Sequence, residues 1–269
     1  MSSHYRLSLT SDKLKFFPSM CLILLATEPT KKYKFVMASN RDEFFSRPTE
    51  SAHWWKDPQG FLAGKDLEQG GTWMGVSKDG KFAAVTNVRE FYKDEPHEKF
   101  LSRGDLVKDF FNFPGSPKNY VKDIEAEKYM GFNLIVSNLE SSSVFSSQGI
   151  ENFNSELIVI GNRALNTETE KLKSAEKDFQ AIITDNFNHS DLISLMQSPK
   201  KNYEFDSKQI RNNHGNEFNS RFITSDIYGT RSTTVITIDR ENQVNVSEVV
   251  YDGLGKNSES NFFNFKIQS

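Results

Sequence analysis

The sequence predicts one α+β domain in which antiparallel sheets carry helices on their outer faces. β-prone runs open and close the chain, and helical patterns lie between them. The Asp79-Gly80 pair separates two apolar runs, which is typical of a β-hairpin. The 23 Phe among 269 residues also require a large buried core, and one domain of this length can provide it.

The chain begins with a predicted hairpin. Residues 21–26 form a continuous apolar run, residues 28–31 are turn material, and residues 33–38 form a second β-prone run. This second run ends abruptly in Asn40-Arg41-Asp42-Glu43. We therefore expect four polar side chains at a strand exit, where catalytic and binding groups are commonly held.

Further helices and strands have recognisable boundaries. Ser102 with Asp105 indicates a capping box, and Ser116 followed by Pro117 indicates another helix start. Apolar residues at three-to-four spacing predict an amphipathic helix over residues 168–184, and a short helix follows near Leu192. Residues 198–220 are expected to form a surface loop. The predicted strands cover residues 71–77, 81–87, 132–137, 143–147, 156–160, 233–238, 243–251 and 262–267.

The composition argues against several classes of function. Lys and Arg number 33 and Asp and Glu 36, so the net charge of -3 provides no global positive field for a nucleic acid or an anionic membrane. The longest apolar run, residues 22–26, is too short to span a bilayer. A single Cys cannot form an intrachain disulfide. No metal site and no required cofactor are expected, because the spacing of the histidines fits no metal motif: His4, His53, His97, His189 and His214.

Cys21 follows Met20 at the head of the first predicted strand. If translation starts at Met20 and this Met is removed, Cys21 becomes the first residue, and its own α-amino group can act as the base that activates the thiol. Residues 1–19 are then an extension outside the fold, and residues 20–269 form the domain. The alternative is a buried structural cysteine.

Several motifs support the first interpretation. The segment 38–44 contains Asn40-Arg41-Asp42-Glu43 and precedes Arg47-Pro48, so it resembles the signature of the NRDE family, the Transport and Golgi organisation 2 proteins. The similarity runs in order from Cys21 to about Ser269, and it departs from the family at Arg163 and over residues 186–219. The other matching blocks are Gly70 to Val76, Ala84 to Asn87, Arg103 to Val107, Gly131 to Leu134 and Tyr228 to Thr234.

This resemblance implies an αββα sandwich of antiparallel sheets, similar to N-terminal-nucleophile hydrolases that cleave linear amides. In such enzymes an Arg and an Asp hold the amino terminus and the thiol, Asn residues supply oxyanion and orienting contacts, and a distal Arg closes the site. The matching positions here are Cys21, Arg41, Asp42, Asn87, Asn162 and Arg231.

The resemblance also implies a cellular role, in Golgi organisation, protein secretion and mobilisation of haem or lipid, with a cytoplasmic, mitochondrial or Golgi-associated location. The expected partner is a small hydrophobic ligand, with haem, lipid and acyl groups left open. Haem would be exchangeable cargo, and His53 beside Trp54 and Trp55 is one candidate axial ligand. The alternative function is an N-terminal cysteine amidohydrolase. Because one fold hosts several functions, the hydrolase-like residues alone do not establish activity.

Overall fold

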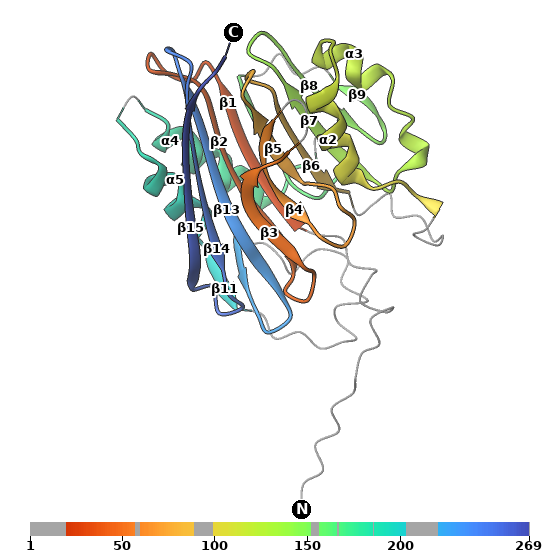
Figure 1. The fold of residues 1–269 in the computed structure, drawn as a ribbon. Coiled ribbons are helices and arrows are strands. Elements are labelled where there is room, and N and C mark those ends of the chain that lie inside the picture. Colours follow the sequence, from red (N-terminus) through yellow and green to blue (C-terminus); the bar gives the residue numbers. More distant parts are fainter. Residues whose placement is uncertain are drawn as a thin grey trace, which may run out of the picture.

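A computed structural model describes residues 20–56, 60–88, 99–151, 156–165, 167–184, 186–202 and 220–268. Two antiparallel sheets face each other, and helices cover their outer sides (Figure 1). The six-stranded sheet has the order β10-β1-β2-β13-β14-β15, and the seven-stranded sheet runs from β3 to β9 in sequence order. The predicted αββα sandwich is confirmed.

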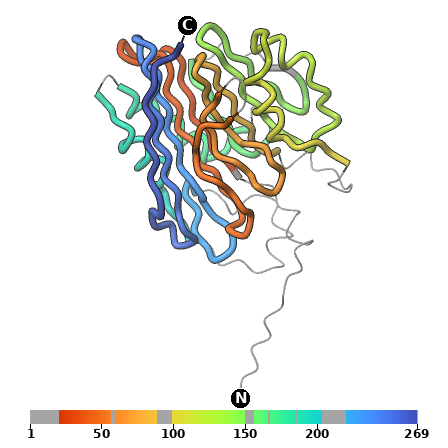
Figure 2. The backbone as a smooth tube through the Cα atoms, in the orientation of Figure 1, coloured from red at the N-terminus to blue at the C-terminus, as the bar shows by residue number. Residues whose placement is uncertain are grey.

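The six-stranded sheet joins the two ends of the chain (Figure 2). Its strands are β1 (Met20–Thr27), β2 (Tyr33–Phe44), β10 (Leu157–Ile160), β13 (Tyr228–Asp239), β14 (Gln243–Tyr251) and β15 (Asn257–Lys266). The seven-stranded sheet contains β3 (Thr49–Trp54), β4 (Phe61–Asp66), β5 (Met74–Ser77), β6 (Phe82–Asn87), β7 (Phe132–Ser137), β8 (Ser142–Ser146) and β9 (Gly149–Glu151). A small parallel pair is formed by β11 (Lys200–Asn202) and β12 (Phe222–Thr224).

The helices form two separate outer layers. The helices α2 (Arg103–Asn112) and α3 (Pro117–Lys122), followed by the short η2 (Ala126–Lys128), cover the seven-stranded sheet. The helices α4 (Glu170–Ile182) and α5 (His189–Met196) cover the six-stranded sheet. One apolar cluster lies between the sheets and one lies beneath each helical layer. A smaller cluster contains Phe222, Val249 and Tyr251. The predicted Phe-rich core is confirmed, because seven Phe side chains are fully buried: Phe61, Phe82, Phe110, Phe111, Phe132, Phe179 and Phe222.

The polar quartet does not follow a strand but lies within one. β2 continues to Phe44, so Asn40, Arg41, Asp42 and Glu43 are strand residues. The prediction of a strand exit was wrong because β13 pairs with β2 along this whole stretch, from Phe44 to Tyr33. This tertiary pairing supplies strand hydrogen bonds to residues whose side chains are polar.

Local signals predicted some helix and strand boundaries but not others. The hairpin at Gly80 is confirmed, with φ of 82°, and Ser116 caps α3 by accepting from the N–H of Asn119. The capping box at Ser102 is wrong, because its side chain makes no cap hydrogen bond. β3 and β4 were missed, since β3 is only half-buried and shows no clear alternation of apolar and polar residues. The expected loop over residues 198–220 is corrected at its start, because β11 occupies residues 200–202 by pairing with β12. Residues 1–19, the expected extension, and residues 203–219 of the expected loop lie outside the described residues.

His189, at the start of α5, joins this helix to the sheet. Its two ring nitrogens lie 2.7 Å from Ser247 Oγ on β14 and 2.9 Å from Thr237 Oγ1 on β13. Burial lowers the pKa of His189 to about 4. The neutral imidazole is therefore the form that the folded protein holds.

This shift predicts a loss of stability in mild acid. Below the ordinary pKa of His, about 6.5, the unfolded chain binds a proton at residue 189 that the folded chain does not bind. The contribution of neutral His189 to the free energy of unfolding is therefore fully present above pH 6.5. It falls as the pH approaches 4, by at most about 3 kcal/mol. Urea unfolding at several pH values measures the free energy of unfolding of wild type and of His189→Gln, in which residue 189 cannot titrate. Parallel curves of unfolding free energy against pH for the two proteins would contradict the assignment.

Candidate active site

Cys21 lies at the start of β1, on the face that packs towards the second sheet. Its side chain is buried, with 6% exposed. Arg41 is its cross-strand partner on β2, so the two side chains leave the sheet on the same face. On the other side, β10 pairs Ile160 with Ile23, and continuing this register by two residues sets Asn162 opposite Cys21.

The backbone nitrogen of Cys21 is bound by a side chain. It donates to Oδ1 of Asn162 at 2.5 Å, and Nδ2 of Asn162 donates to the backbone carbonyl of Asn87 at 2.9 Å. β10 has ended at Ile160, so an amide side chain here takes the place of a strand carbonyl. Asn162 and Asn87, both predicted as site residues, are thus brought to Cys21 by the ends of β10 and β6.

Arg41 is a buried cation beside the thiol. Its guanidinium lies 4.1 Å from the centre of the Trp73 ring and donates to Thr49 Oγ1 at 3.1 Å. Burial lowers the pKa of Arg41, whereas the negative charges of Glu43, Asp66 and a Cys21 thiolate raise it. The electrostatic coupling is mutual, so the same guanidinium favours the thiolate form of Cys21.

Trp73 packs at the edge of the core between the sheets, and its ring also faces Arg41. Gly64 on β4 makes room for this ring, because a Cβ at that position would collide with it. Gly64 lies within β4 and Trp73 lies just before β5, and no sequence pattern relates the two or reveals the contact.

An ion-pair network surrounds Arg41. Arg47 donates to Asp66 from Nε at 2.9 Å and from Nη2 at 2.7 Å, and it lies within 3.4 Å of Glu68. Glu43 accepts from the N–H of Phe44 and lies 3.9 Å from Arg47. The network holds the turn after β2 and concentrates charge at this end of the molecule.

Arg231 is at the same end of the sheet as Cys21. It is the extra residue of a β-bulge, because Thr230 pairs with Asp42 and Ser232 pairs with Arg41. Its guanidinium donates to the carbonyls of Phe44 and Arg47, at 2.7 and 2.9 Å. Burial lowers the pKa of Arg231, and the nearby charge of Arg41 lowers it further. Both arginines therefore reach this end of the sandwich.

Asp42 and Asn40 leave β2 on the opposite face from Arg41, as alternation along a strand requires. Asp42 Oδ1 accepts from Thr230 Oγ1 at 2.7 Å. Asn40 donates to the carbonyls of Met196 and Arg221, which joins β2 to the helical layer. The nitrogen of Cys21 donates to Asn162, and the role of Asp42 in holding an amino terminus stays a prediction.

Glu248 was not predicted from the sequence. It is 2% exposed, projects from β14 between the sheets, and accepts from the N–H of Ala52 at 2.6 Å. Burial raises the pKa of Glu248, while hydrogen bonds from Ala52 and Asn261 and the charge of Arg41 lower it. Its hydrogen-bond partner Ala52 is distant in the sequence, so no local signal marks Glu248.

His53 lies on β3. Its Nδ1 is 2.8 Å from the carbonyl of Ser51, its Nε2 is 3.7 Å from Glu50, and its ring stacks with Trp55. No group of three or more His, Cys, Asp and Glu in the described part of the chain has an arrangement that could hold a metal ion. No helix within the same ranges is long and apolar enough to cross a membrane.

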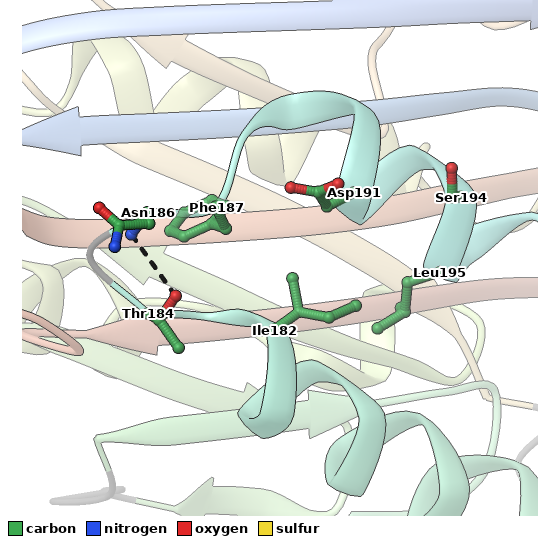
Figure 3. A pocket seen from close by; sticks show the side chains of 7 residues that line it. All are labelled: Ile182, Thr184, Asn186, Phe187, Asp191, Ser194 and Leu195. Atoms are coloured by element: carbon green, nitrogen blue, oxygen red, sulfur yellow. Dashed lines mark hydrogen bonds between the residues drawn. The ribbon is translucent and has the colours of Figure 1, made fainter.

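Two surface pockets lie on the helical side of the six-stranded sheet. Figure 3 shows one of about 430 Å³ between the end of α4 and α5, with Ile182, Asp191 and Leu195 in its lining. The other, about 310 Å³, lies between β10 and α4, and Gly161 and Arg163 are in its lining. Neither is lined by Cys21 or His53. These two pockets therefore offer no haem cavity at His53.

The strands thus bring three groups to one end of an αββα sandwich. These are a thiol, a buried guanidinium, and a side-chain amide that accepts from the nitrogen of the thiol residue. The fold of this sandwich is similar to that of N-terminal-nucleophile hydrolases. A solved structure with a similar fold is the N-acylethanolamine-hydrolyzing acid amidase ortholog of Caenorhabditis elegans, with a TM-score of 0.51 and 12% sequence identity. The match covers 80% of this chain and 92% of that chain.

The sequence comparisons agree with one another. The family model of Transport and Golgi organisation 2 matches residues 20–253, and the chain belongs to this family. The mouse Transport and Golgi organization 2 homolog is 27% identical over 93% of this chain and 100% of its own length. The Drosophila melanogaster Transport and Golgi organization protein 2 is 27% identical over 90% of this chain and 96% of its own.

Proposed function

We propose that this protein is an N-terminal cysteine amidohydrolase that cleaves linear amides with an apolar acyl group. The observation that carries the proposal is the bond from the nitrogen of Cys21 to Asn162 Oδ1. A free α-amino group at this position would be held beside its own thiol, as a nucleophile that uses its own amine as base requires.

Each step follows from groups at the site. The amine of Cys21 takes the thiol proton, and Arg41 stabilises the resulting thiolate. The thiolate attacks the acyl carbon, and we assign donation to the developing oxyanion to the side-chain amide of Asn87, as the family resemblance implies. The C–N bond then breaks, the ammonium returns the proton to the leaving amine, and an acyl thioester remains on Cys21. Water attacks this thioester, releases the carboxylic acid and restores the thiol.

The acyl-enzyme provides the test of the reaction. Incubation with a series of N-acyl amides of increasing chain length, followed by acid quenching and peptide mass analysis, should reveal an acyl adduct on Cys21. The adduct should accumulate before free acid appears at its steady rate. If free acid forms without any adduct on Cys21, the proposed nucleophile is wrong.

The family defines a second candidate function. The names of the relatives refer to transport and Golgi organisation, and a role of this chain in that process, in the cytoplasm, in mitochondria or at the Golgi, is compatible with hydrolysis of a lipid amide. Carriage of haem has weaker support, because Glu50 and Ser51 already contact the ring of His53. Absorbance titration with haem tests it: a His53→Ala variant should bind as wild type does if His53 is no ligand.

A further inference from the structure

Asn162 belongs to a turn that the second sheet holds by polar contacts. Thr86 Oγ1, on β6, donates to the carbonyl of Gly161 at 2.8 Å. Nδ2 of Asn133, on β7, donates to the carbonyl of Arg163 at 2.9 Å. The carbonyls on both sides of Asn162 are therefore fixed from one sheet, while its side chain binds Cys21 at the head of the other.

Thr86 and Asn133 act as a pair. They are cross-strand partners on β6 and β7, and Nδ2 of Asn133 also lies 3.4 Å from Thr86 Oγ1. Both side chains face the six-stranded sheet, because their strands place alternate neighbours such as Ala84 and Ile135 in the core between the sheets. The exposed fraction is 1% for each, so the contacts are shielded from water.

The buried side chain of Asn133 lowers the stability of the core. Among the described residues its Oδ1 accepts no hydrogen bond, although the atom is buried. A buried amide with one unsatisfied oxygen is less favourable than an apolar side chain of the same shape. Core stability alone therefore does not explain an Asn at this position, whereas its donation to the carbonyl of Arg163 does.

We infer that Thr86 and Asn133 are positioning residues that hold the 161–163 turn, so that Asn162 is fixed on the nitrogen of Cys21. The inference deepens the proposed function and rests on it for its chemical meaning. The two residues touch neither the thiol nor the substrate in this role. They act through Asn162, and the orientation of the nucleophile depends on them.

Hydrogen exchange of single backbone amides in the full 269-residue chain, in which the nitrogen of Cys21 is a peptide amide, tests the inference without any substrate. Asn162→Ala removes the acceptor, so exchange of the Cys21 amide should accelerate by about tenfold or more. Thr86→Val and Asn133→Leu keep the side-chain shape and should accelerate it by a similar factor. The amides of residues 23–25 in β1 should keep their protection. The double variant Asn133→Leu/Asn162→Ala should match Asn162→Ala alone, because the two residues act in series.

A matched control lies at the other end of β7. Ser137 is also buried, and its hydroxyl donates to the carbonyls of Asn138 and Ser141. Ser137→Ala should leave the Cys21 amide unchanged. The pH profile of thiol alkylation should move to higher pH in Thr86→Val and Asn133→Leu and should not move in Ser137→Ala.

Two results would overturn the inference. One is an unchanged Cys21 amide in Thr86→Val and Asn133→Leu while Asn162→Ala accelerates it. The other is a general loss of protection along β1 with a lower Tm, which would mark the pair as structural only. Both can occur while an acyl adduct still forms on Cys21, so they are distinguishable from failure of the proposed function. Conversely, absence of the adduct with the expected exchange pattern would refute only the hydrolase.

Discussion

Cys21→Ala is expected to abolish hydrolysis of N-acyl amides, with a loss of at least about a thousandfold in kcat. A covalent mechanism has no substitute for its nucleophile, and Cys21 is the only Cys in the chain. The free energy of unfolding should change by no more than about 1 kcal/mol, because only one buried sulfur is removed. Steady-state hydrolysis and urea unfolding of the same preparations check both parts.

Cys21→Ser serves as the conservative control. The hydroxyl is a far weaker nucleophile than a thiolate at neutral pH, so activity should remain very low, and any acyl adduct should be an ester rather than a thioester. Hydroxylamine cleaves a thioester faster than an ester, so treatment with it distinguishes the two adducts. Hydrolysis at the wild-type rate in Cys21→Ala would remove this residue from the mechanism.

Arg41→Met is expected to slow alkylation of Cys21 at pH 6.5 by about tenfold, since the thiolate, which is the reactive form, loses the adjacent cation. Met keeps much of the side-chain length, so contact with Trp73 can persist without the charge. The rate of reaction with iodoacetamide is measured from pH 5 to pH 9 in wild type and variant with the same N-terminus. The pH profile of Arg41→Met should be displaced to higher pH than that of wild type.

Two substitutions make this result specific. Arg41→Lys retains the charge but loses the planar stack, so it should give an intermediate profile. Arg240→Met removes an exposed arginine that pairs with Glu28 near the other end of the hairpin, and it should have no effect. If Arg41→Met and Arg240→Met give the same profile as wild type, Arg41 does not stabilise the thiolate.

The sequence predicted the layers of the fold and most long elements because their signals are local. The boundaries of β14 agree fully with the prediction, and α4 occupies most of residues 168–184. β3 was missed because it is only half-buried and shows no clear alternation, and β2 was cut short because its polar end is stabilised by β13. Local pattern cannot report a partner that lies about 190 residues away.

The site residues also differ in whether a sequence signal or a distant contact identifies them. Motif resemblance led to Cys21, Arg41 and Asn162, which the structure brings together. It gave no means of separating Arg41 from Asp42, although strand alternation sends their side chains to opposite faces. Trp73, Thr86 and Asn133 were not assigned to the site, because their contacts depend on how the two sheets are placed.

The measurement that tests the central claim most directly is the intact mass of the protein purified from its own cells, with identification of its first residue. The account predicts a chain that begins at Cys21 with a free α-amino group, because only that group can be both bound by Asn162 and able to accept the thiol proton. A hydrolytically active protein that retains Met20 or any residue before it would contradict the account.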